Sequence, residues 1–279
     1  MANYVSYQIR NRENLHLFIL FYFRMEALLD FECQVQGITV KFKYRDVIGS
    51  GSKGTLIAGS DKQEKQYVAR MIDMKGFNPE TFKKKCQELA SVPPHDLLVR
   101  VLDVLDQGDS CYIITDKAIG KPLLEYLENS TDDDHFGLFY DLINAFHYLH
   151  SEGQIHGNFS PSDAFVSPDT APTDSTRVQV SDYGLVYALY ASSTKSKMGT
   201  EFINMQAMTT CIPPEVFKAS INTEAPGQRW RKFESDIFSL GRVLKEIMSK
   251  GRFRNAGNLQ DILIKNVLNC QSNRNLLEH

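Results

Sequence analysis

Residues 155–166 read IHGNFSPSDAFV, and after a polar loop residues 181–185 read SDYGL. Three further segments extend this pattern in both directions along the chain. Before it lies GSGSKG at 49–54, and after it lie IPPE at 212–215 and SDIFSLG at 235–241. Any one of these short segments could arise by chance, so the information lies in the order and spacing of all five.

The composition is that of an ordinary globular chain. Its 279 residues are 42% hydrophobic and 23% charged, which suits a sizeable core in one large domain or two small ones. The net charge of −3 argues against a nucleic-acid partner, because phosphate backbones require clustered cations. The five cysteines stand far apart without metal-ligand spacing. We therefore expect no zinc site and a reducing, cytoplasmic location.

An apolar run, LHLFILFYF at 15–23, lies near the start of the chain. A helix that spans a membrane needs about 20 apolar residues, so this run predicts no transmembrane span. Residues 1–41 are assigned to an N-terminal extension. Two origins stay open for its apolar part: a docking helix, or extra residues upstream of an internal start at Met25.

Periodicity separates the chain into a strand-rich and a helix-rich part. Alternating apolar and polar residues predict strands at 40–48, 55–58, 66–72, 98–105, 111–115 and 178–181. Helical spacing predicts helices at 79–92, at 135–150 and from 235 onward. The apolar stripe of the 135–150 helix includes Tyr140, Ile143 and Phe146. Strands first and helices later indicate an α+β fold with two lobes.

The segment GSGSKG at 49–54 carries the first chemical signal. Glycines allow backbone N–H groups to approach phosphates without a Cβ in the way. A dinucleotide-binding turn would open a helix, whereas strand-type sequence follows this segment. We therefore expect the tip of a hairpin that covers a nucleotide, with a plain Gly/Ser turn as the alternative.

Together, the five segments resemble the protein-kinase signature set of glycine-rich loop, H-R-D catalytic loop, D-F-G, A-P-E and the Asp of the long central helix. The resemblance covers about residues 42–275. It implies a bilobal, kinase-like α+β fold with a small β-rich N-lobe at 42–118 and a helical C-lobe at 119–279. It also implies that this C-lobe is incomplete, because kinase C-lobes normally continue for two or three helices beyond the point reached here.

The same resemblance implies a site for ATP and Mg²⁺ between the lobes. Its metal ligands would be Asp163 and Asp182. Thr115 would be the gatekeeper, followed by a hinge at 116–118. The expected nucleotide-binding residues are Gly49, Ser50, Gly51, Ser52, Lys53, Gly54, Arg70, Thr115, Asp116 and Ala118.

Two departures from the kinase pattern bear on catalysis. The catalytic-loop Asp, which orients the nucleophile in kinases, is replaced by Asn158, whose neutral amide cannot take a proton. The catalytic-loop Lys is replaced by Ser160, which removes a cation. The H-G-N sequence is similar to that in the pseudokinase domains of Janus kinases. These changes predict loss of general-base function and of a cation at the catalytic loop, while metal and phosphate binding survive.

Two positions stay ambiguous in register. The strand-3 lysine of kinases aligns with Met71 or, after a shift by one residue, with Arg70. Arg70 is preferred, because arginine keeps a charge for the phosphates. The helix-C glutamate aligns with Lys85 or with Glu88 one turn on. If Lys85 holds that position, two cations would face each other.

Within kinases, the nearest resemblance is to the inositol-requiring kinase/endoribonuclease group and its pseudokinase relatives. It rests on IGSGSKGT at 48–55, SDYGL at 181–185, GTE at 199–201, SDIFSLG at 235–241 and NLQ at 258–260. It implies that nucleotide occupancy sets the geometry of a dimer, and no RNA cleavage is carried over. The sequence thus predicts a pseudokinase that binds ATP and partner proteins, and the alternative is a weakly active Ser/Thr kinase.

Overall fold

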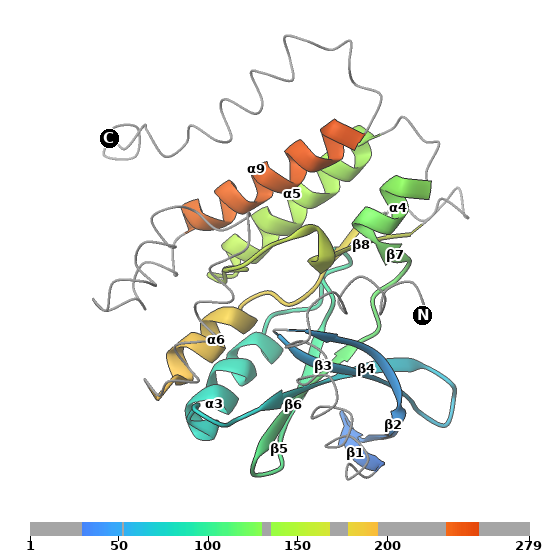
Figure 1. Ribbon diagram of the computed structural model, residues 1–279, viewed down its shortest axis with the longest axis vertical. Coiled ribbons are helices and arrows are strands. Elements are labelled where there is room, and N and C mark those ends of the chain that lie inside the picture. The colour runs from blue at the N-terminus through green and yellow to red at the C-terminus, as the bar shows by residue number, and fades with distance from the viewer. Residues whose placement is uncertain (1–29, 52, 130–134, 168–177, 195–232, 251–279) are drawn as a thin grey trace, which may run out of the picture.

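The computed structural model describes residues 30–51, 53–129, 135–167, 178–194 and 233–250. A strand-rich lobe and a helix-rich lobe lie one above the other in Figure 1, as an α+β kinase-like fold requires. The first lobe contains β1 (Phe31–Val35), β2 (Ile38–Gly51), β3 (Gly54–Ser60), β4 (Gln66–Asp73), α3 (Pro79–Ala90), β5 (Val101–Asp106) and β6 (Ser110–Asp116).

The sheet of the first lobe has the strand order β1-β2-β3-β4-β6-β5, and every pairing is antiparallel. Side chains alternate between its two faces, as strand geometry requires. In β6, Tyr112 and Ile114 pack in a core of the first lobe, whereas Cys111 and Ile113 join the larger core shared with the helices. The sheet therefore separates two hydrophobic cores.

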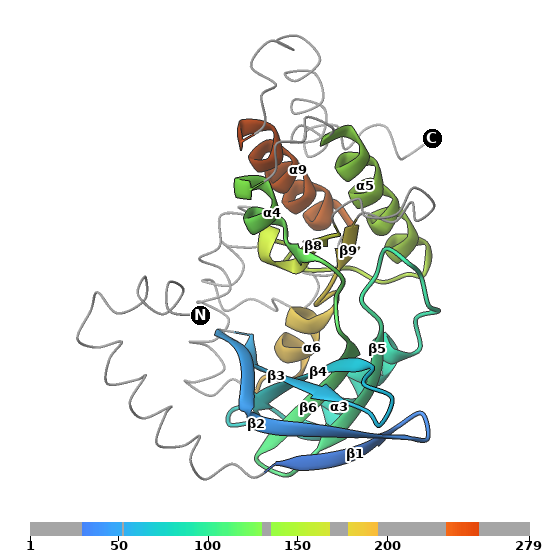
Figure 2. The ribbon, with the colours of Figure 1, turned by 90° about the vertical axis from the view of Figure 1, so that its right-hand side faces the viewer.

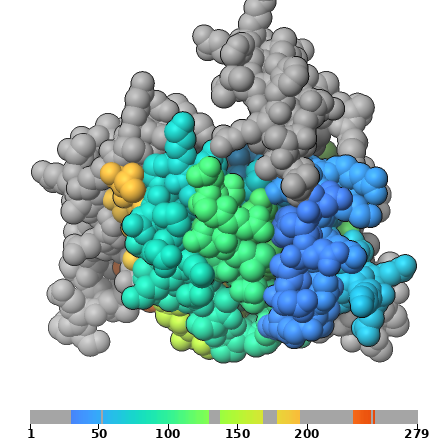
Figure 3. All heavy atoms as spheres, turned by 90° about the horizontal axis from the view of Figure 1, so that it is seen from below, coloured from blue at the N-terminus to red at the C-terminus, as the bar shows by residue number. Residues whose placement is uncertain are grey.

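Residues 31–41, which the sequence assigned to an N-terminal extension, are part of this sheet. Strand β1 pairs with β2 through a two-residue turn at Gln36 and Gly37, whose φ values are 51° and 81°. Such a turn matches the twist of a hairpin, but glutamine is not its usual first residue. The Phe31 ring lies 4.7 Å from the Tyr112 ring, centroid to centroid, and is tilted against it, so the blue β1–β2 hairpin lies beside green β6 in Figure 3.

Helix α3 begins where the sequence predicts. The Asn78 side chain accepts a hydrogen bond from the Thr81 N–H, and Pro79 occupies the first turn. The helix packs against α6 (Leu185–Ser192), which lies beside it in Figure 1. Helix α6 was not predicted. The backbone N–H of Asn78 donates to the carbonyl of Ser192 at 2.7 Å and fixes the two helix ends together.

The second lobe contains α4 (Leu123–Asn129), α5 (His135–Ser151), the short 3₁₀ turn η1 (Pro161–Asp163) and α9 (Phe233–Lys250), with a small sheet of β7 (Lys121–Pro122), β8 (Ala164–Val166) and β9 (Val178–Val180). Helices α5 and α9 pack side by side (Figures 1 and 2). The buried stripe of α5 includes Leu138, Leu142 and Phe146. The predicted stripe was wrong in part, because Tyr140 and Ile143 are exposed.

None of the helices within the described ranges is long and apolar enough to cross a membrane. Several sequence predictions fall outside those ranges: the apolar run at 15–23, Ser52 of the glycine-rich loop, the GTE, IPPE and NLQ segments at 199–201, 212–215 and 258–260, and the expected extent of the C-lobe beyond residue 250.

Candidate nucleotide site

The glycine-rich loop joins β2 to β3 on the side of the first lobe that faces the second lobe. The region between Lys53 and Arg70 of the first lobe and Asp163 and Asp182 of the second is called the cleft below. Gly54 has a φ of 102°, and a Cβ there would overlap the carbonyl oxygen of Met71 on β4. Glycine is therefore required at this position by the protein's own backbone. The other two glycines differ, because a Cβ at Gly51 would meet nothing within 4 Å and one at Gly49 only Leu56, at 3.5 Å. The chain itself does not require glycine at 49 or 51, so these two positions leave room for an approaching ligand.

The register of β4 places Arg70 toward the cleft. Arg70 pairs with Leu56 on β3 and with Ile113 on β6, and directly paired residues of antiparallel strands share a face. Met71 points to the opposite face, where its sulfur lies 3.9 Å from the Tyr44 hydroxyl. Of the two alignments that the sequence left open, the structure therefore brings Arg70 to the site.

Arg70 pairs with the aspartate of the SDYGL segment. Its Nη2 lies 2.6 Å from Oδ1 and 2.7 Å from Oδ2 of Asp182, and its Nη1 donates to the carbonyl of Lys53 at 3.2 Å. The Arg70 and Asp182 side chains are 12% and 14% exposed. This ion pair links the sheet of the first lobe to the second lobe.

A second ion pair crosses the cleft. Lys53 Nζ lies 2.5 Å from Oδ1 of Asp163 and 3.6 Å from Oδ2 of Asp182. The other oxygen of Asp163 accepts hydrogen bonds from the Ser160 N–H at 2.9 Å and the Ser160 hydroxyl at 2.8 Å. The structure thus gathers Lys53, Arg70, Asp163 and Asp182 in one cluster, in which two cations face two carboxylates.

The charges of this cluster act on the titration of Asp182. Burial by itself raises the pKa of this carboxyl, but the positive charges of Arg70 and Lys53 outweigh burial and hold its pKa below the usual value. Asp182 also has a φ of 61°, a conformation uncommon for a residue with a side chain. The ion pairs therefore favour an ionised Asp182 at neutral pH.

The catalytic-loop positions lie beneath this cluster. Asn158 is 2% exposed. The Ser160 hydroxyl contacts the hydroxyl of Ser162 at 2.7 Å as well as Asp163. The position that the sequence assigns to the general base thus holds a buried amide, and the position that it assigns to the catalytic-loop lysine holds a hydroxyl that binds a neighbouring carboxylate.

Asp236 of α9 holds the catalytic loop in place. Its carboxylate accepts hydrogen bonds from the backbone N–H groups of His156 at 2.7 Å and Gly157 at 2.8 Å, and contacts Nε2 of His150 at 2.9 Å. Asp236 is completely buried. Buried backbone donors need such partners, so the aspartate of the SDIFSLG segment shapes the loop that carries Asn158.

His156 is a packed core residue, 1% exposed. Its Nε2 lies 2.8 Å from the Ser181 carbonyl, and its Nδ1 accepts from the Asn158 N–H at 3.4 Å. The first contact needs a proton on Nε2 and the second needs a lone pair on Nδ1, so the two together specify the neutral ring. Burial lowers the pKa of His156 below its usual value, which agrees with that tautomer.

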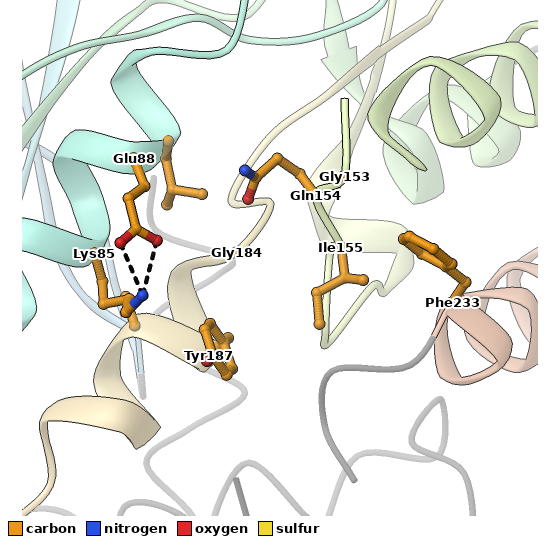
Figure 4. A pocket seen from close by; sticks show the side chains of 10 residues that line it. Lys85, Glu88, Gly153, Gln154, Ile155, Gly184, Tyr187 and Phe233 are labelled. Atoms are coloured by element: carbon orange, nitrogen blue, oxygen red, sulfur yellow. Dashed lines mark hydrogen bonds and ion pairs between the residues drawn. The ribbon is translucent and has the colours of Figure 1, made fainter. Parts of the chain in front are cut away.

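Neither residue proposed for the helix-C acid pairs with Arg70 within the described part of the chain. Lys85 and Glu88 pair with each other, because Lys85 Nζ lies 2.8 Å from both Glu88 oxygens. Figure 4 shows this pair beside Tyr187 of α6, across a hollow from Phe233 and Ile155. Two cations therefore do not face each other, and Asp182 takes the role of partner to Arg70.

The expected hinge lies at the end of β6. Thr115 pairs with Val68 across the β4–β6 ladder, so it shares the cleft face of Arg70. Asp116 forms an ion pair with Lys65 at 2.9 Å, and its backbone N–H donates to the Arg100 carbonyl. The chain leaves the sheet after Asp116 and continues through Ala118 toward α4.

Sequence reasoning missed the apolar part of this cleft face. Leu56 and Val68, both half-buried, lie on the same side of the sheet as Arg70 and Thr115. Two half-buried aliphatic side chains beside a hinge offer a surface for a planar base. The alternation of strand residues from Arg70 back to Val68 was a signal that could have identified them.

The sequence profile of the protein tyrosine and serine/threonine kinase family matches residues 42–275. The match spans most of the chain, and the bilobal fold and cleft described above agree with it. The chain belongs to this family of protein kinases.

Individual relatives are distant. The chain is 26% identical over 210 residues to the membrane-associated tyrosine- and threonine-specific cdc2-inhibitory kinase wee-1.3 of Caenorhabditis elegans. This match covers 74% of this chain and 28% of the worm protein. It is 24% identical over 231 residues to the serine/threonine-protein kinase ULK1 of Homo sapiens, over 80% of this chain and 20% of the other. The chain thus spans less than a third of the length of these relatives.

A solved structure shares the fold. The kinase domain of maize sucrose-induced receptor kinase 1, bound to AMP-PNP, superposes with a TM-score of 0.58 over 78% of this chain and 71% of the maize chain. The two sequences are 19% identical, so this likeness concerns the fold alone.

Proposed function

We propose that this chain is a pseudokinase, a kinase-fold module that binds ATP and acts through contacts with partner proteins rather than through phosphoryl transfer. The observation that carries the proposal is the pair of substitutions in the catalytic loop. Asn158 is a buried amide, and the Ser160 hydroxyl is directed at Asp163. Kinase catalysis depends on an aspartate that orients the substrate hydroxyl and on cations that stabilise the transferred phosphoryl group. Loss of a positioned base costs roughly 10²–10⁴ in rate.

Three features support ATP as the ligand. Gly49 and Gly51 leave space at the loop that faces the cleft. Arg70 places a guanidinium group, which binds phosphates well, on the cleft face of the sheet. Leu56 and Val68 offer an apolar surface for the base. The maize kinase domain that shares the fold was solved with the ATP analogue AMP-PNP.

The proposed partners are proteins, and a second copy of the chain is one of them. The likeness to the inositol-requiring group implies this mode of action, in which nucleotide occupancy alters the dimer. Sedimentation of the purified chain with and without ATP tests it, because the proposal expects the monomer–dimer distribution to change with nucleotide. A monomer–dimer distribution that is the same with and without ATP would contradict the proposed nucleotide-dependent dimer.

A second candidate function is weak Ser/Thr phosphotransfer. It is favoured by the presence of both acidic residues, Asp163 and Asp182, in the cleft. Positioning and electrostatics supply much of phosphoryl-transfer catalysis, so loss of the base alone does not abolish it. The two candidates differ in what the wild-type chain does with bound ATP.

Two measurements on the purified full chain test the proposed function. Thermal unfolding with ATP at about 100 times its Kd should show stabilisation of about 2.7 kcal/mol, a shift of a few degrees for a chain of this size. Autophosphorylation should remain at background for the wild type. An Asn158→Asp variant that still binds ATP reports on the rest of the site: a large gain of transfer means that only the base is missing. Absence of an ATP-dependent shift in a cooperatively folded sample would overturn the proposed function.

A further inference from the structure

The ammonium of Lys53 lies between the two carboxylates that the kinase resemblance assigns to metal. Nζ is 2.5 Å from Asp163 and 3.6 Å from Asp182. Its side chain is 15% exposed, and the Asp163 side chain is 3% exposed. Lys53 belongs to the turn between β2 and β3, so a cation from the first lobe reaches across the cleft to both acids.

The remaining acceptor capacity of these acids is also engaged. The Asp163 oxygen that does not contact Lys53 accepts two hydrogen bonds from Ser160. Both oxygens of Asp182 contact Arg70. Every carboxylate oxygen of the cluster therefore has at least one donor from the chain itself.

This donor set does not fit a divalent cation. Mg²⁺ takes six oxygen ligands in near-octahedral geometry and loses its water reluctantly. To bind Asp163 and Asp182, it would have to displace an ammonium and disturb a guanidinium, and it would then lie beside two positive charges.

We propose that Lys53 stands in for the divalent cation, so that this chain binds metal-free nucleoside triphosphate and does not need Mg²⁺ to do so. The inference rests on the proposed nucleotide binding and specifies its ligand. A lysine ammonium has three N–H donors on a flexible stem. One donor can stay on Asp163 while the others bind phosphate oxygens, so that Lys53 bridges carboxylate and phosphate as a metal ion would.

The position of Lys53 in the chain supports this role. It lies two residues after Gly51, where a Cβ would meet nothing within 4 Å, and its own carbonyl accepts a hydrogen bond from Arg70. The loop that would cover the phosphates thus carries its own cation and is tied to a second one. Lys53 and Arg70 together balance Asp163 and Asp182 in charge, so the cluster is complete without an ion.

The first test measures nucleotide affinity by calorimetry. ATP is titrated into the full chain in excess EDTA and in excess MgCl₂. For the wild type, the two Kd values should agree within about threefold, because the chain supplies the cation that bridges the phosphates to the acids. Lys53→Met should weaken metal-free binding by about tenfold or more, and Mg²⁺ should restore it, since the two carboxylates are then free to take a cation.

A matched control comes from the same β2–β3 hairpin. Lys41 lies on β2 and pairs with Glu32 at 2.7 Å, with side chains 56% and 54% exposed. Lys41→Met removes one lysine charge and one ion pair from the same hairpin, outside the cleft. It should leave both Kd values as in the wild type. If Lys53→Met does not fold, Lys53→Gln, which keeps a neutral donor, takes its place.

The second test needs no nucleotide. Free Mn²⁺ is followed by electron paramagnetic resonance as the chain is added. The wild type should leave the signal of free Mn²⁺ unchanged, and Lys53→Met should reduce it. Mn²⁺ binding by the wild type at the cleft, lost in Asp163→Asn, would overturn the inference.

The outcomes separate the two proposals. Wild-type ATP binding that requires Mg²⁺ overturns the role of Lys53 and leaves the proposed function standing. Metal-independent binding that persists unchanged in Lys53→Met also overturns that role. ATP binding in neither buffer overturns the proposed function, and this inference with it.

Discussion

Arg70 Nη2 lies 2.6 and 2.7 Å from the two carboxylate oxygens of Asp182. The pair joins the central strand of the first lobe to the segment that begins α6 in the second lobe. In the kinase template the cation at this strand position pairs with a glutamate of helix C, whereas here Lys85 and Glu88 of α3 pair with each other. Because Arg70 pairs with Asp182, the two cations of the first lobe and the two carboxylates of the second lobe form one charge cluster.

Removal of one partner of the Arg70–Asp182 pair should lower the free energy of unfolding strongly. Both side chains are more than four-fifths buried, and loss of one member of a buried pair costs about 3–5 kcal/mol. Because Lys53 also lies near Asp182, we expect Arg70→Met to cost about 3 kcal/mol, at the lower end of that range. Urea unfolding measures this, and the double variant with Asp182→Asn should recover part of the loss.

The control for the Arg70 and Asp182 variants is an ion pair on the surface. Lys121 and Glu125 lie 3.2 Å apart, with side chains 56% and 52% exposed, and such pairs contribute about 0–1 kcal/mol. Lys121→Met should therefore change the free energy of unfolding little. Equal losses of unfolding free energy in Arg70→Met and Lys121→Met would contradict a larger contribution from the buried Arg70–Asp182 pair.

Alanine substitutions at two glycines of the loop should have different effects, one on stability and the other on ATP binding. Gly54→Ala places a Cβ against the Met71 carbonyl at a φ of 102°, so it should destabilise the fold by more than 1 kcal/mol. Gly51→Ala meets no atom within 4 Å and should leave the melting temperature unchanged. The same change should weaken ATP binding, because the methyl group enters the space left for the phosphates. A Gly51→Ala variant with wild-type ATP affinity would contradict this view of the loop.

Asp236 should be required for the shape of the catalytic loop. Asp236→Ala leaves the backbone N–H groups of His156 and Gly157 without their acceptor, and each unsatisfied buried donor costs about 1–3 kcal/mol. We expect a loss of about 3 kcal/mol or more, with faster amide hydrogen exchange at these two residues. Asp236→Asn retains one acceptor oxygen and should lose less. Unchanged hydrogen exchange at both amides in Asp236→Ala would contradict the role of Asp236 in holding the catalytic loop.

His156 should make stability depend on pH near neutrality. Its pKa in the folded chain is below the unfolded value because of burial, so the unfolded chain binds more protons as the pH falls. The stability contributed by the neutral ring is present above about pH 6.5 and is lost as the pH decreases, by at most about 1.4 kcal/mol per pH unit. The charged groups that act on the ring are Asp163, Lys53, Asp236 and Asp182.

His156→Gln provides the comparison, since glutamine keeps a donor for the Ser181 carbonyl but does not titrate in this range. Chemical unfolding at pH 7 and pH 5 should show a larger loss for the wild type than for the variant. Parallel losses in the two proteins would assign the pH dependence to other groups.

Much of the fold could be predicted because its signals are local. Strand alternation over 66–72 and the Asn78–Pro79 helix start depend on neighbouring residues, and both agree with β4 and α3. The hairpin of residues 31–41 could not be assigned, because Gln36 is an unusual residue for its turn. The buried stripe of α5 was misread at Tyr140 and Ile143, since aromatic and aliphatic residues extend over more than one face of that helix.

The sequence named Lys53, Arg70, Asp163 and Asp182 as candidates, but it could not indicate how they pair. The register of β4 favours Arg70 over Met71, as the preferred alignment had it. The partners of Arg70 and Lys53 depend on how a loop and a segment more than 100 residues away meet across the cleft. Helix α6 was missed for a related reason, because its apolar residues gain their partners only when α3 packs beside them.

The central claim is that the chain holds ATP without transferring its γ-phosphate, and a single-turnover measurement tests it most directly. The full chain, in excess over γ-labelled ATP with Mg²⁺ present, is incubated with a generic protein substrate, and the fate of the label is followed. We predict that the label stays in ATP and that the wild type and Asp182→Asn cannot be distinguished. Transfer of the label to protein by the wild type, abolished in Asp182→Asn, would contradict the account and identify an active kinase.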